Sequence, residues 1–238
     1  LAYDWIHDVL TPDDRARAEA VFASMVGTPT VEMFAKEWWL DGPRASGRNT
    51  TNWTPICTSN LGLTNFVLEG RPGYNPALAG LCRTYMRAFL DEGIGPDGGM
   101  YEGTGYPLGF GTDHTPYYLA ALLLRGDDAL VASTHLPRVA EWLAYDMLPW
   151  GGEGNAHNQA QGHYGPGSFL TFIAARFGGL AAWVFGRSTD EWGARGGAVP
   201  NQMSVLYGLP DPASARPPDG LPLARMAVSS AFLPSCHS

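Results

Sequence analysis

Residues 75–90 read NPALAGLCRTYMRAFL, and this stretch decides the fold. Its apolar side chains return every three or four positions, which is the spacing of one face of an α-helix. The apolar positions are Leu78, Leu81, Cys82, Tyr85, Met86 and Phe89. The pattern therefore predicts a helix over residues 75–90 that buries one face in a core.

Similar patterns extend on both sides of this stretch. Residues 52–69 are predicted to be helical, with buried positions at Ile56, Leu61, Leu63, Phe66 and Val67. Further helices are predicted over residues 117–125, 129–147 and 168–185, with a weaker one over residues 189–207. No strand pattern of any length appears. The sequence therefore predicts an all-α array of antiparallel helix pairs.

The N-terminal part carries a clear helix start. Residues 3–10 read as the end of one helix, and Thr11-Pro12-Asp13-Asp14 reads as the start of the next. Thr11 suits the N-cap, Pro12 suits the first helical position, and the two acids suit the positive end of the helix dipole. We expect the apolar face of this helix to consist of Ala18, Val21, Phe22 and Met25.

Composition excludes several classes of protein. The chain has 238 residues, and 23 acidic against 15 basic side chains give a formal charge of −8. An acidic chain without a Lys/Arg cluster is a poor candidate for binding nucleic acid or an anionic membrane. No apolar run approaches the roughly 18 residues of a spanning helix, so we expect no membrane insertion. Leu1-Ala2-Tyr3-Asp4-Trp5 does not open a signal peptide, so we expect no targeting signal in this chain.

The cysteines and the polar segments suggest where chemistry lies. Cys57, Cys82 and Cys236 form no spacing that would hold zinc, so we expect no metal. Polar side chains instead gather in two glycine-rich segments, residues 91–111 and 150–168. Loops of this kind between rigid helices are a common way to build a site. We therefore expect a cleft lined by these loops and by the start of the helix at Asn52.

Residues 97–106, DGGMYEGTGY, resemble a segment of the heparinase II/III-like polysaccharide lyase family and of the related dermatan-sulfate epimerase module. Residues 52–55 and 164–166 add support, and the resemblance spans roughly residues 1–185. It implies an incomplete (α/α) toroid-like domain over residues 1–207, followed by a Pro-rich extended segment over residues 208–238. The family's β-sandwich portion is expected to be absent from this chain and to lie in a partner domain of a longer polypeptide.

The resemblance also implies a reaction and a set of site residues. Family members act at C5 of a uronate, which requires a neutralised carboxylate, a base for the C5 proton and, in a lyase, an acid for the leaving O4. Tyr106 matches the catalytic tyrosine, and Asn52 matches the asparagine that neutralises the carboxylate. No cofactor is implied. Trp53 stands where several members have histidine, so the expected base is His114, His157 or His163. The expected substrate-binding residues are Trp53, Tyr101, Glu102, Arg48 and Tyr164, with Arg44 adding positive charge.

Alternatives remain at this stage. Asn52 also suits a helix N-cap, and Trp53 also suits core packing. The carboxylates Asp97, Glu102, Asp113 and Glu153 would suit a glycoside hydrolase on a helical toroid. A uronate C5-epimerase and a non-catalytic glycan-binding or truncated module are further alternatives. In each case the expected partner is an acidic polysaccharide, and the resemblance implies an extracellular or periplasmic location.

Overall fold

The computed structural model describes residues 2–28, 30–32, 51–100, 114–146, 167–194, 206 and 208–218. The α-helices in these ranges are α1 Ala2–Ile6, α2 Pro12–Met25, α5 Trp53–Val67, α6 Pro76–Ala88, α7 Thr115–Leu124, α8 Ala129–Ala132, α9 Val139–Asp146, α10 Ser168–Phe177 and α11 Gly179–Ala194. Shorter turns are η1 His7–Val9, η3 Phe89–Gly93, η5 Leu136–Arg138 and η6 Pro212–Ser214. The described part is all-α, with two isolated bridges, Ile94–Met100 and Gly179–Ala215, and no strand. None of its helices is long and apolar enough to cross a membrane.

Helix α2 begins as its sequence predicts. The Thr11 side chain accepts a hydrogen bond from the Asp14 backbone N–H at 3.2 Å and so caps the helix. The expected apolar face is partly wrong, because Val21 is 57% and Met25 is 48% exposed. The face that packs toward the core is rotated by one position and consists of Phe22, Ala23 and Val26.

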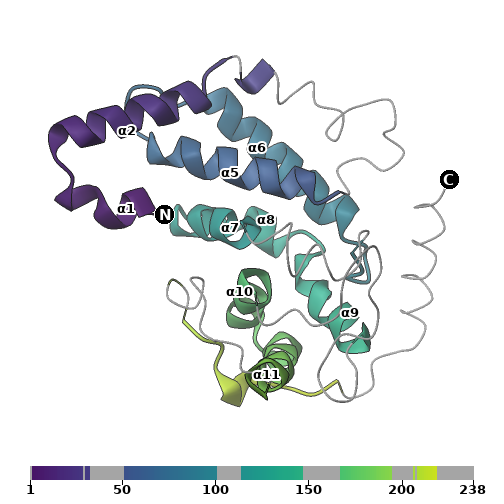
Figure 1. Cartoon of the computed structure of the whole chain (residues 1–238). Coiled ribbons are helices and arrows are strands. Elements are labelled where there is room, and N and C mark those ends of the chain that lie inside the picture. Colours follow the sequence, from purple (N-terminus) through teal and green to yellow (C-terminus); the bar gives the residue numbers. More distant parts are fainter. Residues whose placement is uncertain are drawn as a thin grey trace.

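Helices α5 and α6 form an antiparallel hairpin that a pair of buried amides holds together (Figure 1). The Asn65 Nδ2 donates to the Asn75 carbonyl at 2.9 Å, and its Oδ1 accepts from the Asn75 N–H at 2.9 Å. The Asn75 side chain in turn caps α6 by accepting from the Leu78 N–H, and it donates to the Val26 carbonyl. This end of the hairpin is therefore tied to α2 as well.

Helix α7 runs parallel to α5. A Cβ at Gly62 would lie 2.3 Å from the Tyr118 ring, which means that the two helices approach closely at these positions. Seven residues further along each helix, the Glu69 carboxylate accepts from the Arg125 Nε at 2.6 Å. Because both contacts advance in the same direction, residue n of α5 lies level with residue n + 56 of α7.

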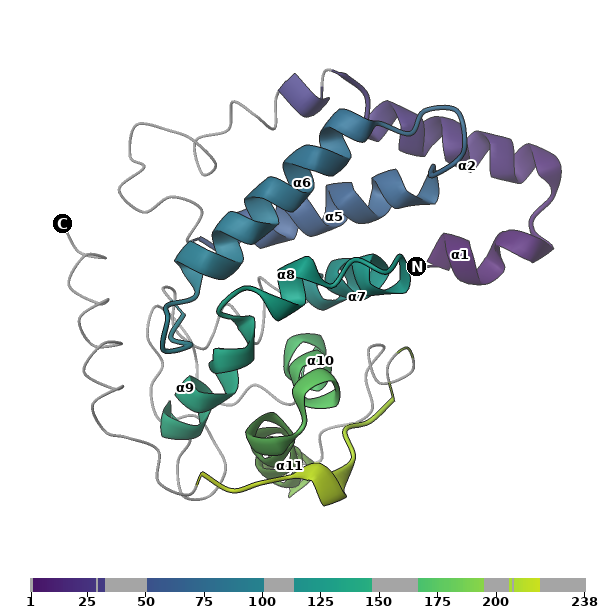
Figure 2. The ribbon, with the colours of Figure 1, turned by 180° about the vertical axis from the view of Figure 1, so that it is seen from behind.

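Helix α8 likewise lies beside α6 and runs in the same direction. Arg83 pairs with Asp127 at 3.0 Å, and Arg87 donates to the Ala129 carbonyl at 3.1 Å. The chain therefore stacks one helical hairpin on the next, with α5 and α7 in one layer and α6 and α8 in a second (Figure 2). The all-α prediction is confirmed for the described residues.

Two predicted helices are broken in the structure. A single helix over residues 168–185 is wrong, because Gly178 adopts φ 59° and ends α10, and α11 begins at once at Gly179. The weaker helix expected from residue 189 is the continuation of α11 to Ala194. A single helix over residues 129–147 is also wrong. Pro137 lacks an N–H for a continuous helix, and the chain there divides into α8, η5 and α9.

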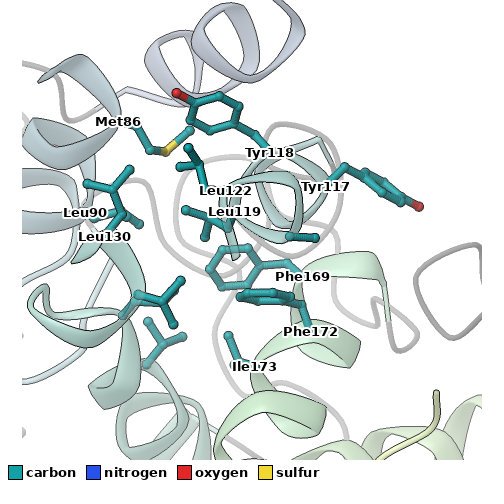
Figure 3. Packing of buried hydrophobic residues seen from close by; sticks show 14 of the residues in the cluster. Met86, Leu90, Tyr117, Tyr118, Leu119, Leu122, Leu130, Phe169, Phe172 and Ile173 are labelled. Carbon is teal, nitrogen blue, oxygen red and sulfur yellow. The ribbon is translucent and has the colours of Figure 1, made fainter. Parts of the chain in front are cut away.

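The core lies between α6, α7, α8 and α10 (Figure 3). Its fully buried side chains come from α6, η3, α7 and α10 and include Met86, Leu90, Leu119, Leu122, Phe169, Phe172 and Ile173. The consecutive residues Tyr117 and Tyr118 point in different directions, so α7 contacts both neighbouring hairpins. Residues 208–218 contact the start of α11, where the Arg216 N–H donates to the Gly179 carbonyl at 3.0 Å.

Candidate functional site

Helices α5, α7 and α10 begin at one end of the molecule. By the parallel register, the start of α7 lies level with Thr58 and Ser59 in the second turn of α5. The Tyr117 hydroxyl, in the first turn of α7, lies 3.1 Å from Ser168 Oγ, the first residue of α10. We call this region the helix-start end and define it by Asn52, Trp53, His114, Thr115 and Ser168. Helices α7 and α10 each follow one of the two glycine-rich polar segments in the sequence, and α5 follows residues 41–51, which include Arg44 and Arg48.

The helix starts at this end have no side-chain caps. Asn52 occupies the N-cap of α5 with a helical backbone, φ −59° and ψ −20°, and its side chain makes no capping hydrogen bond. His114 precedes α7 and Gly167 precedes α10, likewise without a side-chain cap. No acidic residue lies in the first turn of these helices. The partial positive charge of three helix dipoles is therefore not offset by a carboxylate from the helices themselves.

Four of the predicted site residues lie within the described ranges, and three of them, Asn52, Trp53 and His114, belong to the helix-start end. Asn52 is half-buried, while Trp53 is 52% exposed and so does not serve core packing. His114 is exposed. From the register, His114 lies level with Thr58, which is about 9 Å along the helix axis from Asn52. The remaining predicted residues lie outside the described ranges: Tyr106, His157, His163, Tyr101, Glu102, Arg44, Arg48, Tyr164, Asp113 and Glu153.

A set of buried hydroxyl groups lies beneath this surface. Thr54, Thr58, Ser59 and Thr115, which we call the hydroxyl cluster, are all 0% exposed, and their oxygens have no hydrogen-bond partner. The α5 members continue the stripe that carries Gly62, one and two turns toward the N-terminus. Thr115 lies one turn before Tyr118 on α7. Since Gly62 faces Tyr118, the parallel register brings the two parts of the hydroxyl cluster to the same level.

The hydroxyl cluster differs from other hydroxyl residues of the chain. Thr64, Thr84 and Thr171 each donate to the carbonyl four residues earlier, at 2.7, 3.1 and 3.0 Å. This bond is the usual way for a helical serine or threonine to satisfy its hydroxyl. Members of the hydroxyl cluster do not make it. A buried hydroxyl without a partner costs about 1–3 kcal/mol, so four together are unusual in a structural core.

The first part of the glycine-rich motif has a structural role. Asp97 is 7% exposed, and its carboxylate accepts from the Gly99 N–H at 3.0 Å. Gly98 has φ 89°, and a Cβ there would lie 2.0 Å from the Arg138 carbonyl oxygen. His135, to which the sequence assigned no role, binds the Ile94 carbonyl through Nδ1 at 2.7 Å. Residues 94–100 therefore form a tight turn that is anchored beside η5.

The interior behind the hydroxyl cluster stays uncharged near neutral pH. Burial raises the pKa of the Cys82 thiol to about 12. Burial, with a smaller contribution from Cys82, also raises the pKa of the Tyr118 hydroxyl. Both groups are therefore protonated in ordinary conditions and do not act as bases. In the described part of the chain, no three His, Cys, Asp or Glu side chains gather as metal ligands would.

Sequence reasoning missed the hydroxyl cluster, although a signal exists. Phe66 and Gly62 mark the buried stripe of α5, and counting back in steps of three and four from Gly62 reaches Ser59, Thr58 and Thr54. Hydroxyl residues thus replace apolar ones on a buried face.

Comparison of the chain with protein-family models, with curated proteins and with solved structures gives no match.

Proposed function

We propose that the chain is part of a polysaccharide lyase that cleaves a uronate-containing polysaccharide by β-elimination at the helix-start end. The observation that supports this most is the parallel arrangement of α5 and α7, because it sets Asn52, Trp53 and His114 at one end. The uncapped helix dipoles there favour an anionic substrate locally, although the whole chain carries a charge of −8.

The proposed reaction assigns one step to each group. Asn52 hydrogen-bonds the uronate carboxylate, and the helix starts stabilise the negative charge that develops there when the C5 proton leaves. His114 or His163 takes the C5 proton. The C4–O4 bond then breaks as the C4–C5 double bond forms, and Tyr106 donates its proton to the departing O4. The exposed ring of Trp53 supplies a flat apolar surface for a sugar ring.

The proposed function also implies a particular arrangement of the helices. Hairpins that stack with parallel helices within each layer are what one arc of an (α/α) toroid requires, so we propose that this chain forms such an arc. This agrees with the resemblance of residues 97–106 to the heparinase II/III-like family. We also propose that a β-sandwich domain completes the site and that the protein works outside the cell or in the periplasm, where the polymer is found.

One observation bears on the hydrolase alternative. A glycosidase needs two carboxylates that flank the scissile bond. Asp97 is buried and binds the Gly99 backbone N–H in the turn beside η5, so it does not suit either role. An epimerase, a hydrolase built from other carboxylates and a glycan-binding module are outcomes of the test below.

The test is to incubate the protein with a panel of uronate polymers and to follow ultraviolet absorbance, reducing ends and binding together. A lyase produces a 4,5-unsaturated uronate, so absorbance and reducing ends rise in parallel. Reducing ends without absorbance indicate hydrolysis, altered C5 configuration without cleavage indicates epimerisation, and binding alone indicates a module. Each of these three results overturns the lyase proposal.

Substitution of the central residue separates the reaction class from the assignment. We expect Tyr106→Phe to lower the rate of absorbance increase about a hundredfold or more. Tyr74→Phe, in the turn between α5 and α6, is the matched control and should leave the rate unchanged. If Tyr106→Phe keeps the wild-type rate, Tyr106 is not the acid.

A further inference from the structure

The hydroxyl cluster offers a second site, which is distinct from the exposed residues of the proposed lyase activity. Its four side chains are fully buried and their oxygens have no hydrogen-bond partner. Independently of this, α5 and α7 both begin beside it without a side-chain cap. We propose that the hydroxyl cluster binds a small inorganic anion between the second turn of α5 and the first turn of α7.

Charge favours an anion over a cation at this position. The N-terminus of a helix carries partial positive charge, and neither first turn contains an acidic residue that would offset it. Residues 53–67 and 115–124 include no charged side chain at all. A cation would therefore meet two positive helix ends and no carboxylate from either helix. Helix N-termini are in general suitable sites for anions.

The donors match the same ligand. Each hydroxyl of the hydroxyl cluster offers one O–H donor that its own helix does not use. A hydrogen bond to an ion is roughly twice as strong as one between neutral groups. Thr58 and Thr115 come from different helices at the same level, so a single small ion between the helices can accept from both sides.

Burial limits the size of the ligand. Because the four side chains have no exposed surface, a halide ion suits the site better than a larger oxyanion. The carboxylate of a single uronate presents the same negative charge and is the second source to be tested. The proposal does not depend on lyase activity, since a halide site is measurable in an inactive protein.

The first experiment measures thermal unfolding of the whole chain at constant ionic strength, while chloride or bromide replaces a bulky organic anion. We expect the melting temperature to rise with halide concentration and to saturate, as binding to the folded state alone requires. Free glucuronate is titrated in parallel. Saturation by halide assigns the site to a free ion, and saturation by glucuronate alone assigns it to a substrate carboxylate. No saturable response to either overturns the proposal.

The second experiment uses variants that change only the hydroxyl. Thr58→Val and Thr115→Val should each weaken halide binding about tenfold, and Thr58→Ser should retain it. Thr171→Val is the matched control, because Thr171 is also buried but already donates to the Gly167 carbonyl. It should leave the halide affinity unchanged.

Two results would contradict the assignment. If Thr58→Val binds halide as tightly as the wild type, the site lies elsewhere. If Thr58→Val lowers the melting temperature equally at every halide concentration, the hydroxyls serve buried water and not an ion. Anomalous scattering from bromide-soaked crystals supplies a direct check, with a peak expected between Thr58 and Thr115.

Discussion

The two ends of the α5–α7 pair treat their polar groups in opposite ways. At the end where these helices finish, Arg125 binds the Glu69 carboxylate and also lies 4.1 Å from the centre of the Phe66 ring. Arg71 nearby contacts both the Tyr3 hydroxyl and the Glu19 carboxylate. We call this the paired end and define it by Tyr3, Glu19, Glu69, Arg71 and Arg125. At the helix-start end, caps are missing and the hydroxyl cluster has no partner.

This difference separates the part that holds the fold together from the part that is available for ligands. A cavity of about 620 Å³ lies along α7 from Tyr117 to Arg125, but its lining is mainly apolar and the guanidinium of Arg125 is already bound to Glu69. Polar groups that are satisfied within the protein have little to offer a ligand. Groups left without partners cost stability, which is why we place the proposed anion site at the hydroxyl cluster.

The largest expected effect comes from a substitution in the turn of residues 94–100, which is anchored beside η5. Gly98→Ala puts a Cβ 2.0 Å from the Arg138 carbonyl oxygen, at a residue with φ 89°. The positive φ and the overlap with rigid backbone together should cost about 4 kcal/mol of unfolding free energy. Gly70→Ala is the control at the paired end, because Gly70 has φ 75° with no atom within 4 Å.

Urea unfolding measures both variants. Gly70→Ala should lose only about 1–2 kcal/mol, the cost of the left-handed backbone alone. Equal losses in the two variants would mean that residues 94–100 shift freely and that the turn is not an anchor.

The second prediction breaks the paired end. Asn65→Ala removes both hydrogen bonds to the Asn75 backbone and leaves a partly buried N–H and a partly buried carbonyl without this partner. We expect a loss of about 3 kcal/mol in chemical denaturation. Asn60→Ala, whose amide is exposed and bonds only to the Ile56 carbonyl, should change stability by less than about 0.5 kcal/mol. A small loss in Asn65→Ala would show that water replaces the amide.

Much of the helical scaffold could be predicted from the sequence. The apolar spacing of residues 75–90 predicts α6, and the Thr11-Pro12 start predicts the beginning of α2. The break at Gly178 could not be predicted, because the apolar pattern continues through it. The positive φ angles of Gly178 and Gly179 are visible only in the structure. Val21 and Met25 also mislead, since apolar residues are often exposed without any local sign of it in the sequence.

Less of the candidate site follows from the sequence. The motif directs attention to the helix starts at Asn52 and His114, but no single sequence reveals that α5 and α7 run parallel. That fact depends on a contact between residues far apart, Gly62 and Tyr118. Threonine in a helix usually satisfies its own hydroxyl, so the unpartnered state of Thr58 becomes visible only in three dimensions.

The third prediction concerns the interior between the two ends. Because burial raises the pKa of Cys82 from an ordinary value of 9.0 to about 12, the folded protein holds the proton that the unfolded chain releases. The contribution of this thiol to the free energy of unfolding is therefore fully present below pH 9 and is lost as the pH rises toward 12. Between pH 8 and 10 the loss from this thiol should be about 1.4 kcal/mol.

Cys82→Ala provides the check on this assignment. The variant should be less stable at pH 8, because it loses buried volume, but its stability should decline less between pH 8 and 10. Unfolding free energies measured at several pH values distinguish the two effects. An identical decline in wild type and variant would mean that other groups cause it.

The smallest expected effect is the difference in stability between Thr58→Val and Thr171→Val, which tests the contrast between unpartnered and partnered hydroxyls directly. In buffer without halide, Thr171→Val should lose about 1 kcal/mol, because it removes a hydroxyl that bonds to the Gly167 carbonyl. Thr58→Val should lose less than about 0.5 kcal/mol or even gain stability, because it replaces a buried hydroxyl that has no partner with a methyl group of similar size. Both threonines are buried in helices that contact α7, so the pair isolates hydrogen bonding from burial. Differential scanning calorimetry resolves the difference, and a larger loss in Thr58→Val than in Thr171→Val would show that the helix-start end is as well satisfied as the paired end.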